Sequence, residues 1–372
     1  MNYILFGGTF DPIHNGHVRI ASAASLKLNA DVIFIPARSP RWKTPLTTYK
    51  ERLAMLKLAI KQCPSGTTIS DFEIKSNADI NYTIDTVRHF KKKYPKDKLY
   101  LLIGADQVNR FSEWKNAEEI ANLAQITFVS RPSVKLDQNV IKTYHMLDLS
   151  FLESGDVSST SFREMKSIDI PEKVLDYIEK HKLYFFSKLE KILPKDRLEH
   201  CIQVANLSLR IAKVNKLPNL EKYYFAGLLH DVGKTYYKED ENMISLMKKY
   251  YPQYINFPSF SYHQFIGEHL ANEIFGIEDK EILEAIKYHC TGNENMSTLG
   301  MVVYTSDKIE PTRGFDSRWL INSCLANYKQ GFIDTLIDNK KYLLAHNKDI
   351  TNDLTDKCFE MYLPKELNNE KR

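Results

Sequence analysis

The sequence pattern changes about halfway along the 372-residue chain, and this change most restricts the fold. In the first half, short apolar runs typical of β-strands alternate with helical segments, whereas strand-like runs almost disappear from the second half. Regular alternation predicts βαβ units and a parallel sheet with right-handed crossovers. Helical periods alone predict a helix bundle. Because a single core seldom grows far beyond roughly 250 residues, we expect two domains, residues 1–186 and 187–372.

The elements of the first half can be located from the hydrophobic periodicity. The expected strands are residues 3–6, 32–36, 67–74, 98–103 and 126–129, and the expected helices are residues 16–28, 50–63 and 83–94. In a parallel α/β sheet, ligands bind at the carboxyl ends of the strands. We therefore expect the chemistry of this half in the loops that lead from strands into helices.

The composition restricts the classes of partner. The net charge is only +4, without one concentrated basic segment, so we expect small polyanions rather than nucleic acid. The five cysteines form no CxxC pair, which is typical of reduced thiols and not of a disulfide framework or a zinc ribbon. No apolar stretch approaches the roughly 18 residues of a membrane span, and the sequence starts in a strand without a leader-like segment. We therefore expect a cytoplasmic protein with no membrane partner.

The loop after the first strand has the sequence GGTFDPIHNGH, residues 7–17. Gly7 and Gly8 allow a sharp turn and a close approach of the backbone to a ligand. The first helix then begins near residues 15–17, where unpaired N–H groups and the helix dipole favour phosphate. His14 and His17 lie in the same turn and can stabilise negative charge that develops on a phosphoryl group. This combination predicts a phosphate-handling site, although a glycine pair alone is as readily explained as a simple turn.

The same loop resembles the signature of the nucleotidyltransferase superfamily, including its HxGH box. Four further segments resemble motifs of this superfamily in the same order: IPARSPRWK, YTIDT, GAD and VSSTSFR. Together, residues 1 to about 184 resemble the bacterial nicotinate-nucleotide adenylyltransferases. The chain departs from the family at Trp42, where the family usually has histidine.

This resemblance implies a Rossmann-like domain that transfers the adenylyl group of ATP, accompanied by Mg²⁺, to nicotinate mononucleotide. The products would be deamido-NAD and pyrophosphate, formed by in-line attack without a covalent enzyme intermediate. His14 and His17 would stabilise the pentacoordinate phosphorus. Lys43 and Arg163 would bind the flanking phosphates. Pantetheine phosphate or the amide mononucleotide remains an alternative acceptor, because no feature of the sequence itself selects the acid.

The resemblance also implies a set of nucleotide contacts. Asp106 would bind ribose hydroxyls, Trp114 would stack on the pyridine ring, and the backbone near Thr86 would bind the pyridine carboxylate. Residues 158–160 open a helix and would bind phosphate through hydroxyl and N–H groups. The implied contacts are Gly7, Gly8, Thr9, Phe10, Asp11, Thr86, Gly104, Asp106, Trp114, Ser158, Ser159 and Thr160.

The second half carries histidines and aspartates on otherwise apolar helical segments. The candidates are His200, His230, Asp231, His263, His289 and Asp307. Their spacing is too wide for a local zinc knuckle, so they can meet only if different helices of a bundle bring them together. Helical spacing predicts that His200 is largely buried, and a buried titratable group is costly unless it is paired or binds a metal. Each histidine taken alone is more readily explained as a hydrogen-bonded core residue than as a ligand.

The order H…HD…H…H…D resembles the HD-domain metallohydrolases. The flanking segments HQFIGEHLA, AIKYHCTG and SDKIEPTR narrow the resemblance to the symmetrical diadenosine tetraphosphate hydrolases of that superfamily, over residues 190 to about 345. This resemblance implies an all-α HD-domain bundle with a dinuclear metal centre. The implied metal is iron, but the ligand types also allow manganese, zinc or cobalt. The implied ligand sets are His200, His230 and Asp307 for one ion, His263 and His289 for the other, and Asp231 for both.

The same resemblance implies how the second site acts. Two metal ions can activate water and bind the oxygens of an in-line phosphoryl displacement. Asp231 would bridge the ions, Lys234 and Arg313 would bind the polyphosphate, and diadenosine tetraphosphate would be cut into two ADP. Two alternatives remain open at this point. In the first, the second half would act on a cyclic dinucleotide or an alarmone. In the second, it would be a non-catalytic nucleotide sensor that regulates the first half.

Overall fold

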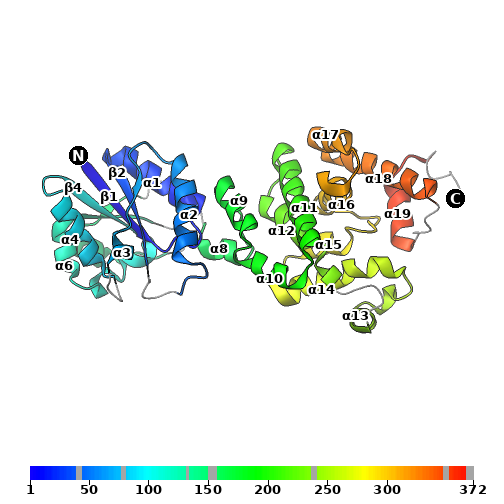
Figure 1. Ribbon diagram of the computed structural model, residues 1–372, viewed down its shortest axis with the longest axis horizontal. Helices are drawn as coiled ribbons and strands as arrows, with labels where there is room; N and C mark the ends of the chain where they lie inside the picture. Colours follow the sequence, from blue (N-terminus) through cyan, green and yellow to red (C-terminus); the bar gives the residue numbers. More distant parts are fainter. Residues whose placement is uncertain are drawn as a thin grey trace. The chain divides into compact units, whose positions relative to one another are not determined.

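In the computed structural model, the described part of the first half contains one sheet of six parallel strands (Figure 1). The described residues are 1–38, 44–76, 81–130, 134–149, 157–235, 241–346 and 352–365. The strands are β1 Asn2–Gly8, β2 Asp31–Pro36, β3 Thr68–Ile69, β4 Lys98–Gly104, β5 Gln125–Val129 and β6 Leu147–Asp148. They lie in the order β3-β2-β1-β4-β5-β6, which confirms the α/β parallel sheet expected from the sequence.

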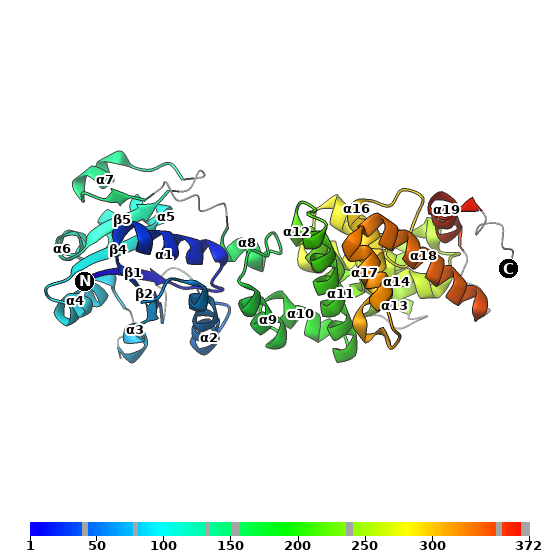
Figure 2. The same cartoon turned by 90° about the horizontal axis from the view of Figure 1, so that it is seen from above.

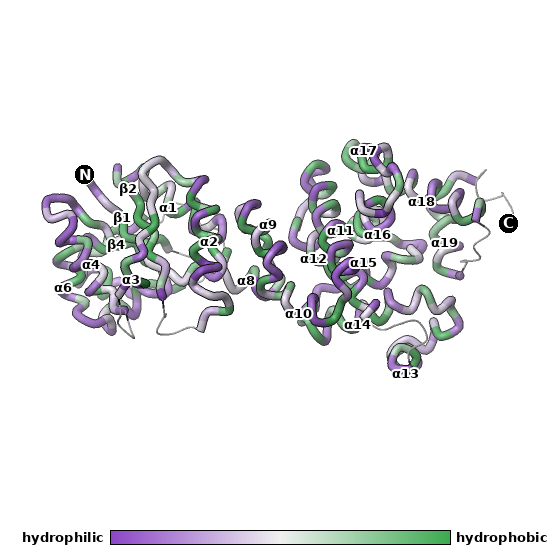
Figure 3. Tube along the Cα trace, in the orientation of Figure 1, coloured by the Kyte–Doolittle hydropathy of each residue, from purple (hydrophilic) through white to green (hydrophobic). Residues whose placement is uncertain are grey.

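Helices cover both faces of this sheet. They are α1 Asn15–Leu28, α2 Tyr49–Ala59, α3 Phe72–Lys75, α4 Thr83–Lys93, α5 Ala105–Val108, α6 Ala117–Leu123, α7 Gln138–Thr143, α8 Ser159–Arg163 and α9 Glu172–Lys180, with 3₁₀ turns at Ile60–Gln62 and Phe111–Glu113. Figure 1 shows α4 and α6 on one face of the sheet and α1 and α2 on the other. Apolar residues of the central strands, such as Leu5 and Leu101, are buried in the core of this unit. Figure 3 shows the hydropathy along the chain.

One expected strand is largely wrong. Instead of a strand over residues 67–74, only Thr68–Ile69 pairs with β2, and the chain then turns into the short helix α3. The Ser70 hydroxyl accepts a hydrogen bond from the Phe72 N–H at 3.2 Å. Such a local bond between side chain and backbone competes with the strand ladder, which explains the early end of β3.

The strand order creates the crevice in which this fold binds ligands. β1 lies between β2 and β4, so the chain crosses to one side of β1 first and to the other side afterwards. Loops that leave the carboxyl ends of β1 and β4 therefore diverge, and a crevice opens between them. Both strands end in glycine, at Gly8 and Gly104.

The second half contains helices and no strand among its described residues, as expected. The helices are α10 Phe185–Ile192, α11 Lys195–Val214, α12 Leu220–Leu229, α13 Glu241–Tyr250, α14 Tyr262–Phe275, α15 Lys280–Lys287, α16 Thr298–Ile309, α17 Arg318–Ala326, α18 Tyr328–Ala345 and α19 Asp353–Tyr362, with 3₁₀ turns at η3 Val232–Thr235, Pro252–Tyr254, Ser259–Ser261 and Pro311–Arg313. None of the described helices is long and apolar enough to cross a membrane. The chain divides into two units, Met1–Arg163 with Asp169–Tyr184, and Glu164–Ile168 with Phe185–Arg372.

The two helices α11 and α12 lie side by side in the second unit (Figure 2). Gly227 of α12 allows this close approach. A Cβ atom at Gly227 would lie 2.8 Å from Ala205 Cα and 3.1 Å from the Val204 carbonyl oxygen. These are backbone atoms of α11, so they cannot move aside without displacing the helix.

We expect Gly227→Ala to lower the free energy of unfolding of the helical unit by about 1–3 kcal/mol, because the added methyl group overpacks the α11–α12 contact. The measurement is the denaturant midpoint of the helical signal in circular dichroism. Gly300→Ala is the control, because its nearest neighbours would be side-chain atoms of Met296 and Ser297, both at 3.3 Å, and no backbone atom of another helix. An equal loss of stability in both variants would contradict the packing argument.

Candidate active sites

A pocket of about 640 Å³ lies in the α/β unit, at the carboxyl ends of β1 and β4. It is lined by many of the residues that the sequence singled out. These are Gly7, Gly8, Thr9, Phe10, Asp11, His14, His17, Gly104, Asp106, Trp114, Ser158, Ser159, Thr160 and Arg163. Lys43 and the neighbouring Trp42 lie outside the described residues. Thr86 is described but does not belong to the lining.

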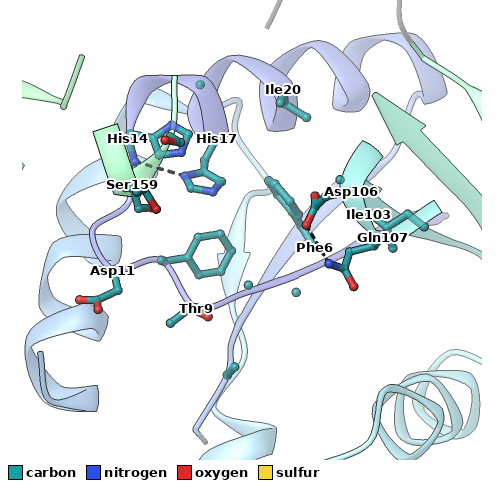
Figure 4. Close-up of a pocket in the computed structure, with 18 of the residues that line it drawn as sticks. Phe6, Thr9, Asp11, His14, His17, Ile20, Ile103, Asp106, Gln107 and Ser159 are labelled. Carbon is teal, nitrogen blue, oxygen red and sulfur yellow. Dashed lines mark hydrogen bonds between the residues drawn. The ribbon is translucent and has the colours of Figure 1, made fainter. Parts of the chain in front are cut away.

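The two histidines of the HxGH box lie together at the start of α1 (Figure 4). Their ring centroids are 3.7 Å apart, and the His14 backbone N–H donates to His17 Nδ1 at 3.3 Å. A neutral His17 that accepts at Nδ1 carries its proton on Nε2, so it is a donor at that atom. Gly16 makes room for this arrangement, because a Cβ atom there would lie 2.9 Å from His14 Nδ1.

The segment around α8 is bonded to the loop after β1. Ser159 Oγ donates to the Pro12 carbonyl oxygen at 2.7 Å, and Arg163 Nη1 donates to the Asp11 carbonyl oxygen at 2.5 Å. Arg163 Nη2 also donates to Thr160 Oγ1 at 3.0 Å. Residues separated by about 150 positions in the sequence therefore line one side of the same pocket.

Asp106 and Trp114 line the same pocket, with Asp106 across it from the histidines (Figure 4). Asp106 lies in α5, just after β4, and accepts a hydrogen bond from Gln107 Nε2 at 2.7 Å. A Cβ atom at Gly104 would lie 2.7 Å from Asp106 Oδ1, so a side chain at this position would displace the carboxylate from its place over the strand end. Trp114 packs against Phe111, with ring centroids 5.2 Å apart.

The Asp11 carboxylate is bonded within the protein. It is 5% exposed, and Oδ1 accepts hydrogen bonds from Thr47 Oγ1 at 2.6 Å and from the Tyr184 hydroxyl at 2.8 Å. Oδ2 accepts from the Leu46 N–H at 2.7 Å. Figure 4 shows this carboxylate directed away from His17. Asp11 therefore fixes the loop that carries the histidines, whereas the sequence suggested only a ligand contact.

Arg52 was not expected from the sequence to belong to this region. Its side chain is 1% exposed, and Nη1 donates to the carbonyl oxygens of Thr9 at 2.8 Å and Ala37 at 2.7 Å. Among the described residues Arg52 forms no ion pair, and burial lowers its pKa. This guanidinium holds the loops after β1 and β2 together. On sequence alone it looks like one more charged residue of an amphipathic helix.

In the helical unit, four buried histidines have one ring nitrogen bonded to a fixed acceptor. The Nδ1 atoms of His230, His263 and His289 each lie 2.7 Å from the carbonyl oxygen three residues earlier in the chain. His200 Nδ1 lies 3.0 Å from Glu310 Oε1. Carbonyl and carboxylate oxygens only accept, so each Nδ1 is the donor and each Nε2 of a neutral ring carries the lone pair.

The Nε2 atoms of these imidazoles face one another. His200 Nε2 lies 3.2 Å from His230 Nε2, and His263 Nε2 lies 3.1 Å from His289 Nε2. Two lone pairs at such distances repel each other unless a proton or a metal ion lies near both. The facing imidazoles therefore fit a cation site.

Two buried carboxylates complete the cluster. Asp231 is 0% exposed, and its Oδ1 lies 3.3 Å from His263 Nε2 and 3.5 Å from His289 Nε2. That oxygen has no hydrogen-bond partner among the described residues, although it is buried. Asp307 Oδ1 lies 3.2 Å from His200 Nε2 and 3.4 Å from His230 Nε2. An unpartnered buried carboxylate oxygen beside imidazole lone pairs has the surroundings that a metal ligand needs.

The six residues expected from the sequence are thus brought together. Groups whose ligand atoms lie within 4.8 Å of one another are His200, His230 and Asp231; His230, His289 and Asp307; and Asp231, His263 and His289. The burial of His200, at 7% exposure, confirms the helical spacing argument. The donor set of imidazole nitrogen and carboxylate oxygen fits a divalent transition metal.

The carboxylates are ionised. Burial alone would raise the pKa of Asp231, but the interactions with His230, the other neighbouring imidazoles and Lys234 outweigh it and hold the pKa well below its usual value. Burial likewise opposes ionisation of Asp307, and Lys308 and Arg313 outweigh it, so its pKa is also well below the usual value. Both groups therefore carry the charge that a metal ligand needs.

The imidazoles on one side of the cluster are neutral. Burial lowers the pKa of His289 to about 4 and lowers that of His263 well below its usual value. For His200, burial also lowers the pKa, but Asp307 and Glu310 outweigh it and raise the pKa overall. Neutral imidazole is the form that binds metal, so His263 and His289 need no deprotonation.

Four cationic side chains surround the cluster. Lys234 Nζ lies 2.9 Å from Asp231 Oδ2, and Arg313 pairs with Asp307. Two further cations were not expected: Arg197 Nη1 lies 2.7 Å from Asp231 Oδ2, and Lys308 Nζ lies 2.8 Å from Asp307 Oδ2. Arg197 precedes His200 by one helical turn and Lys308 follows Asp307 directly, so proximity to the ligands was the available signal.

The partly buried carboxyl group of Glu73, which lies beside Thr86, should make the stability of the fold depend on pH. Thr86 Oγ1 donates to Glu73 Oε1 at 3.0 Å, and burial raises the pKa of Glu73 to about 7 although this bond lowers it. A carboxyl group with a raised folded-state pKa stabilises the fold below its unfolded pKa, and this contribution is lost as the pH rises through 7.

We therefore expect Glu73→Gln to gain stability relative to the unaltered chain between pH 5 and pH 8, since glutamine cannot ionise. The measurement is the melting temperature of both proteins by calorimetry at each pH. A difference in melting temperature that stays constant across this range would show that Glu73 does not titrate there.

The comparisons with known proteins match both units. The chain matches the family model described as cytidylyltransferase-like over residues 5–165 and the HD domain model over residues 197–312. A Mycoplasma genitalium protein named probable nicotinate-nucleotide adenylyltransferase/Ap4A hydrolase is 32% identical over 344 residues, which cover 90% of this chain and 96% of the relative. A Clostridium tetani protein named probable nicotinate-nucleotide adenylyltransferase is 38% identical over 196 residues, 48% of this chain and 97% of the relative.

A solved structure is similar to about half of this chain. A Clostridium acetobutylicum protein described as a predicted HD superfamily hydrolase involved in NAD metabolism has 25% sequence identity and a TM-score of 0.43, and the match covers 50% of this chain and 96% of that one.

Proposed function

Because the chain belongs to the family of nicotinate-nucleotide adenylyltransferase/Ap4A hydrolases, we propose that it is an enzyme with two activities. The α/β unit transfers the adenylyl group of ATP to nicotinate mononucleotide, which gives deamido-NAD and pyrophosphate. The helical unit hydrolyses diadenosine tetraphosphate to two ADP with the help of divalent metal. The observation that carries the proposal is that each unit brings side chains from distant parts of the chain to one polar site.

In adenylyl transfer, the phosphate of nicotinate mononucleotide attacks the α-phosphorus of ATP, and the bond to pyrophosphate breaks. His17 donates from Nε2 to the phosphoryl oxygens as negative charge develops, and His14 lies beside it. Arg163, bonded to the loop after β1, binds a flanking phosphate together with Lys43, which we retain from the sequence. Mg²⁺ accompanies ATP and reduces the repulsion between the phosphates.

The remaining pocket residues bind the two nucleosides. The glycine-rich loop at Gly7 and Gly8 lies against phosphate, and Asp106 accepts from ribose hydroxyls at the end of β4. Trp114 stacks on the pyridine ring. For Thr86 we propose only a backbone contact to the pyridine carboxylate, since its hydroxyl is bonded to Glu73.

In hydrolysis, a divalent metal supplies Lewis acidity to water and to the scissile phosphate when it is bound. We propose that these are two iron ions. The nitrogen and oxygen donors fit iron, and they also fit manganese, zinc and cobalt. His200, His230 and Asp307 would hold one ion, His263 and His289 the other, and Asp231 both. Lys234 and Arg313 bind the polyphosphate.

The alternatives for the helical unit are not favoured. The named relatives support diadenosine tetraphosphate over a cyclic dinucleotide or an alarmone. A non-catalytic sensor would not need the complete set of six ligands that converges here. We further propose that residues 1–186 and 187–372 work as separate functional domains. All five cysteines are free, which supports a cytoplasmic location.

We expect His17→Ala to reduce formation of deamido-NAD by about 10²–10³-fold, because one donor to the transition state is lost. Hydrolysis of diadenosine tetraphosphate by the same preparation should be unchanged. The measurement is chromatography of the products of both reactions. A similar loss of both activities would contradict two independent sites.

We expect Asp231→Ala to remove bound metal and to abolish hydrolysis of diadenosine tetraphosphate, because the carboxylate that lies within 3.6 Å of His230, His263 and His289 is lost. Synthesis of deamido-NAD by the same protein should persist, and the helical signal in circular dichroism is the folding control for the helical unit. Metal content is measured by elemental analysis. Retention of the full metal content would overturn the ligand assignment.

A further inference from the structure

The cationic side chains of the helical site are more numerous than the buried carboxylates need. Each of the two central carboxylates contacts two cations. The pairs are Arg197 and Lys234 on Asp231, at 2.7 and 2.9 Å, and Lys308, at 2.8 Å, with Arg313 on Asp307. A single partner is enough to neutralise one carboxylate, so the second cation in each pair requires another explanation.

The pairs belong to one continuous site. His230 Nε2 lies 3.6 Å from Asp231 Oδ2 and 3.4 Å from Asp307 Oδ1, so a single imidazole contacts both carboxylates. At Asp231, Arg197 and Lys234 contact Oδ2, whereas Oδ1 lies nearest to His263 and His289. The cations therefore leave Asp231 Oδ1 open to metal, whereas at Asp307 the Arg313 guanidinium contacts Oδ1 and Lys308 contacts Oδ2.

The cations also reach solvent, whereas the carboxylates do not. The side chains of Arg197 and Lys308 are 35% and 21% exposed, and those of Lys234 and Arg313 are 32% and 34% exposed. Asp231 is fully buried. A guanidinium has five N–H donors and an ammonium has three, so donors remain for an anion that approaches from solvent.

The net charge of the site is positive, which favours a polyanion. Four cations face three buried carboxylates, Asp231, Asp307 and Glu310, which leaves one positive charge in excess. Each divalent ion that binds adds two more. A chain of several phosphates matches this excess, whereas a cyclic dinucleotide has only two phosphodiester charges.

We propose that Arg197 and Lys308 bind phosphate groups of the substrate directly and thereby select a polyphosphate chain. The inference rests on the proposed hydrolase function and extends it, because neither residue belongs to the expected polyphosphate contacts Lys234 and Arg313. With metal bound to the carboxylates, their hydrogen bonds to Arg197 and Lys308 would weaken, and the guanidinium and ammonium groups would donate to phosphate oxygens instead.

The experiment uses the metal-loaded full chain and its variants Arg197→Ala, Arg197→Lys and Lys308→Ala. Arg210→Ala is the matched control, because Arg210 is exposed on the same helix as Arg197. Three quantities are measured: metal ions per chain, the dissociation constant of inorganic tripolyphosphate by calorimetry, and kcat and KM for diadenosine tetraphosphate.

We expect Arg197→Ala and Lys308→Ala each to weaken tripolyphosphate binding about tenfold or more, as the loss of a charge-assisted hydrogen bond does. KM should rise in parallel, while metal content stays that of the unaltered chain. Arg197→Lys should recover part of the binding, and Arg210→Ala should match the unaltered chain.

Two results would overturn the inference. Unchanged tripolyphosphate binding in both alanine variants would do so, as would a loss of metal with unchanged binding per loaded chain, since Arg197 would then only position Asp231. The proposed function fails separately. If the unaltered chain does not cleave diadenosine tetraphosphate but binds tripolyphosphate through Arg197 and Lys308, the phosphate site stands and only its substrate must be replaced.

Discussion

The helical unit depends on the compensation of charge in its interior. Two ionised carboxylates and four imidazoles lie in a core in which unpaired charge is strongly unfavourable. Nδ1 of each imidazole is bonded to a carbonyl or carboxylate oxygen, and cations pair with both carboxylates. The Nε2 atoms and Asp231 Oδ1 remain and point at one another. This arrangement is stable as a metal centre, and it requires every helix that carries a ligand to keep its position.

The α/β unit holds its polar groups differently. Its pocket must contact a phosphate on which negative charge develops during the reaction, and the donors lie on loops at the carboxyl ends of β1 and β4. Loops are mobile unless they are bonded to something rigid. Asp11 ties the first loop to Thr47 and Tyr184, and Arg52 ties it to the loop after β2. In this unit, buried polar groups therefore hold the loops of the pocket in position. In the helical unit, they form the candidate metal site.

Much of this architecture was predictable, and the failures have physical causes. Patterns of period and spacing reveal a parallel sheet, a helical half and ligands on apolar helices. The prediction of a strand over residues 67–74 was wrong because a local hydrogen bond to the Ser70 side chain competes with the backbone pairing of the sheet. Arg52 and Arg197 were missed because an arginine on an amphipathic helix looks like a solvated residue until the fold brings acceptors to it. Tyr184 was missed because its partner Asp11 lies far away in the sequence.

The central claim is that buried imidazoles and carboxylates of the helical unit hold divalent metal. Anomalous X-ray diffraction from crystals of the iron-loaded full chain, measured at the iron absorption edge, tests it most directly. The account predicts anomalous peaks within coordination distance of His230, His263 and Asp231, among the six converging side chains. Iron bound elsewhere, or no anomalous peak among these side chains in loaded protein, would contradict it.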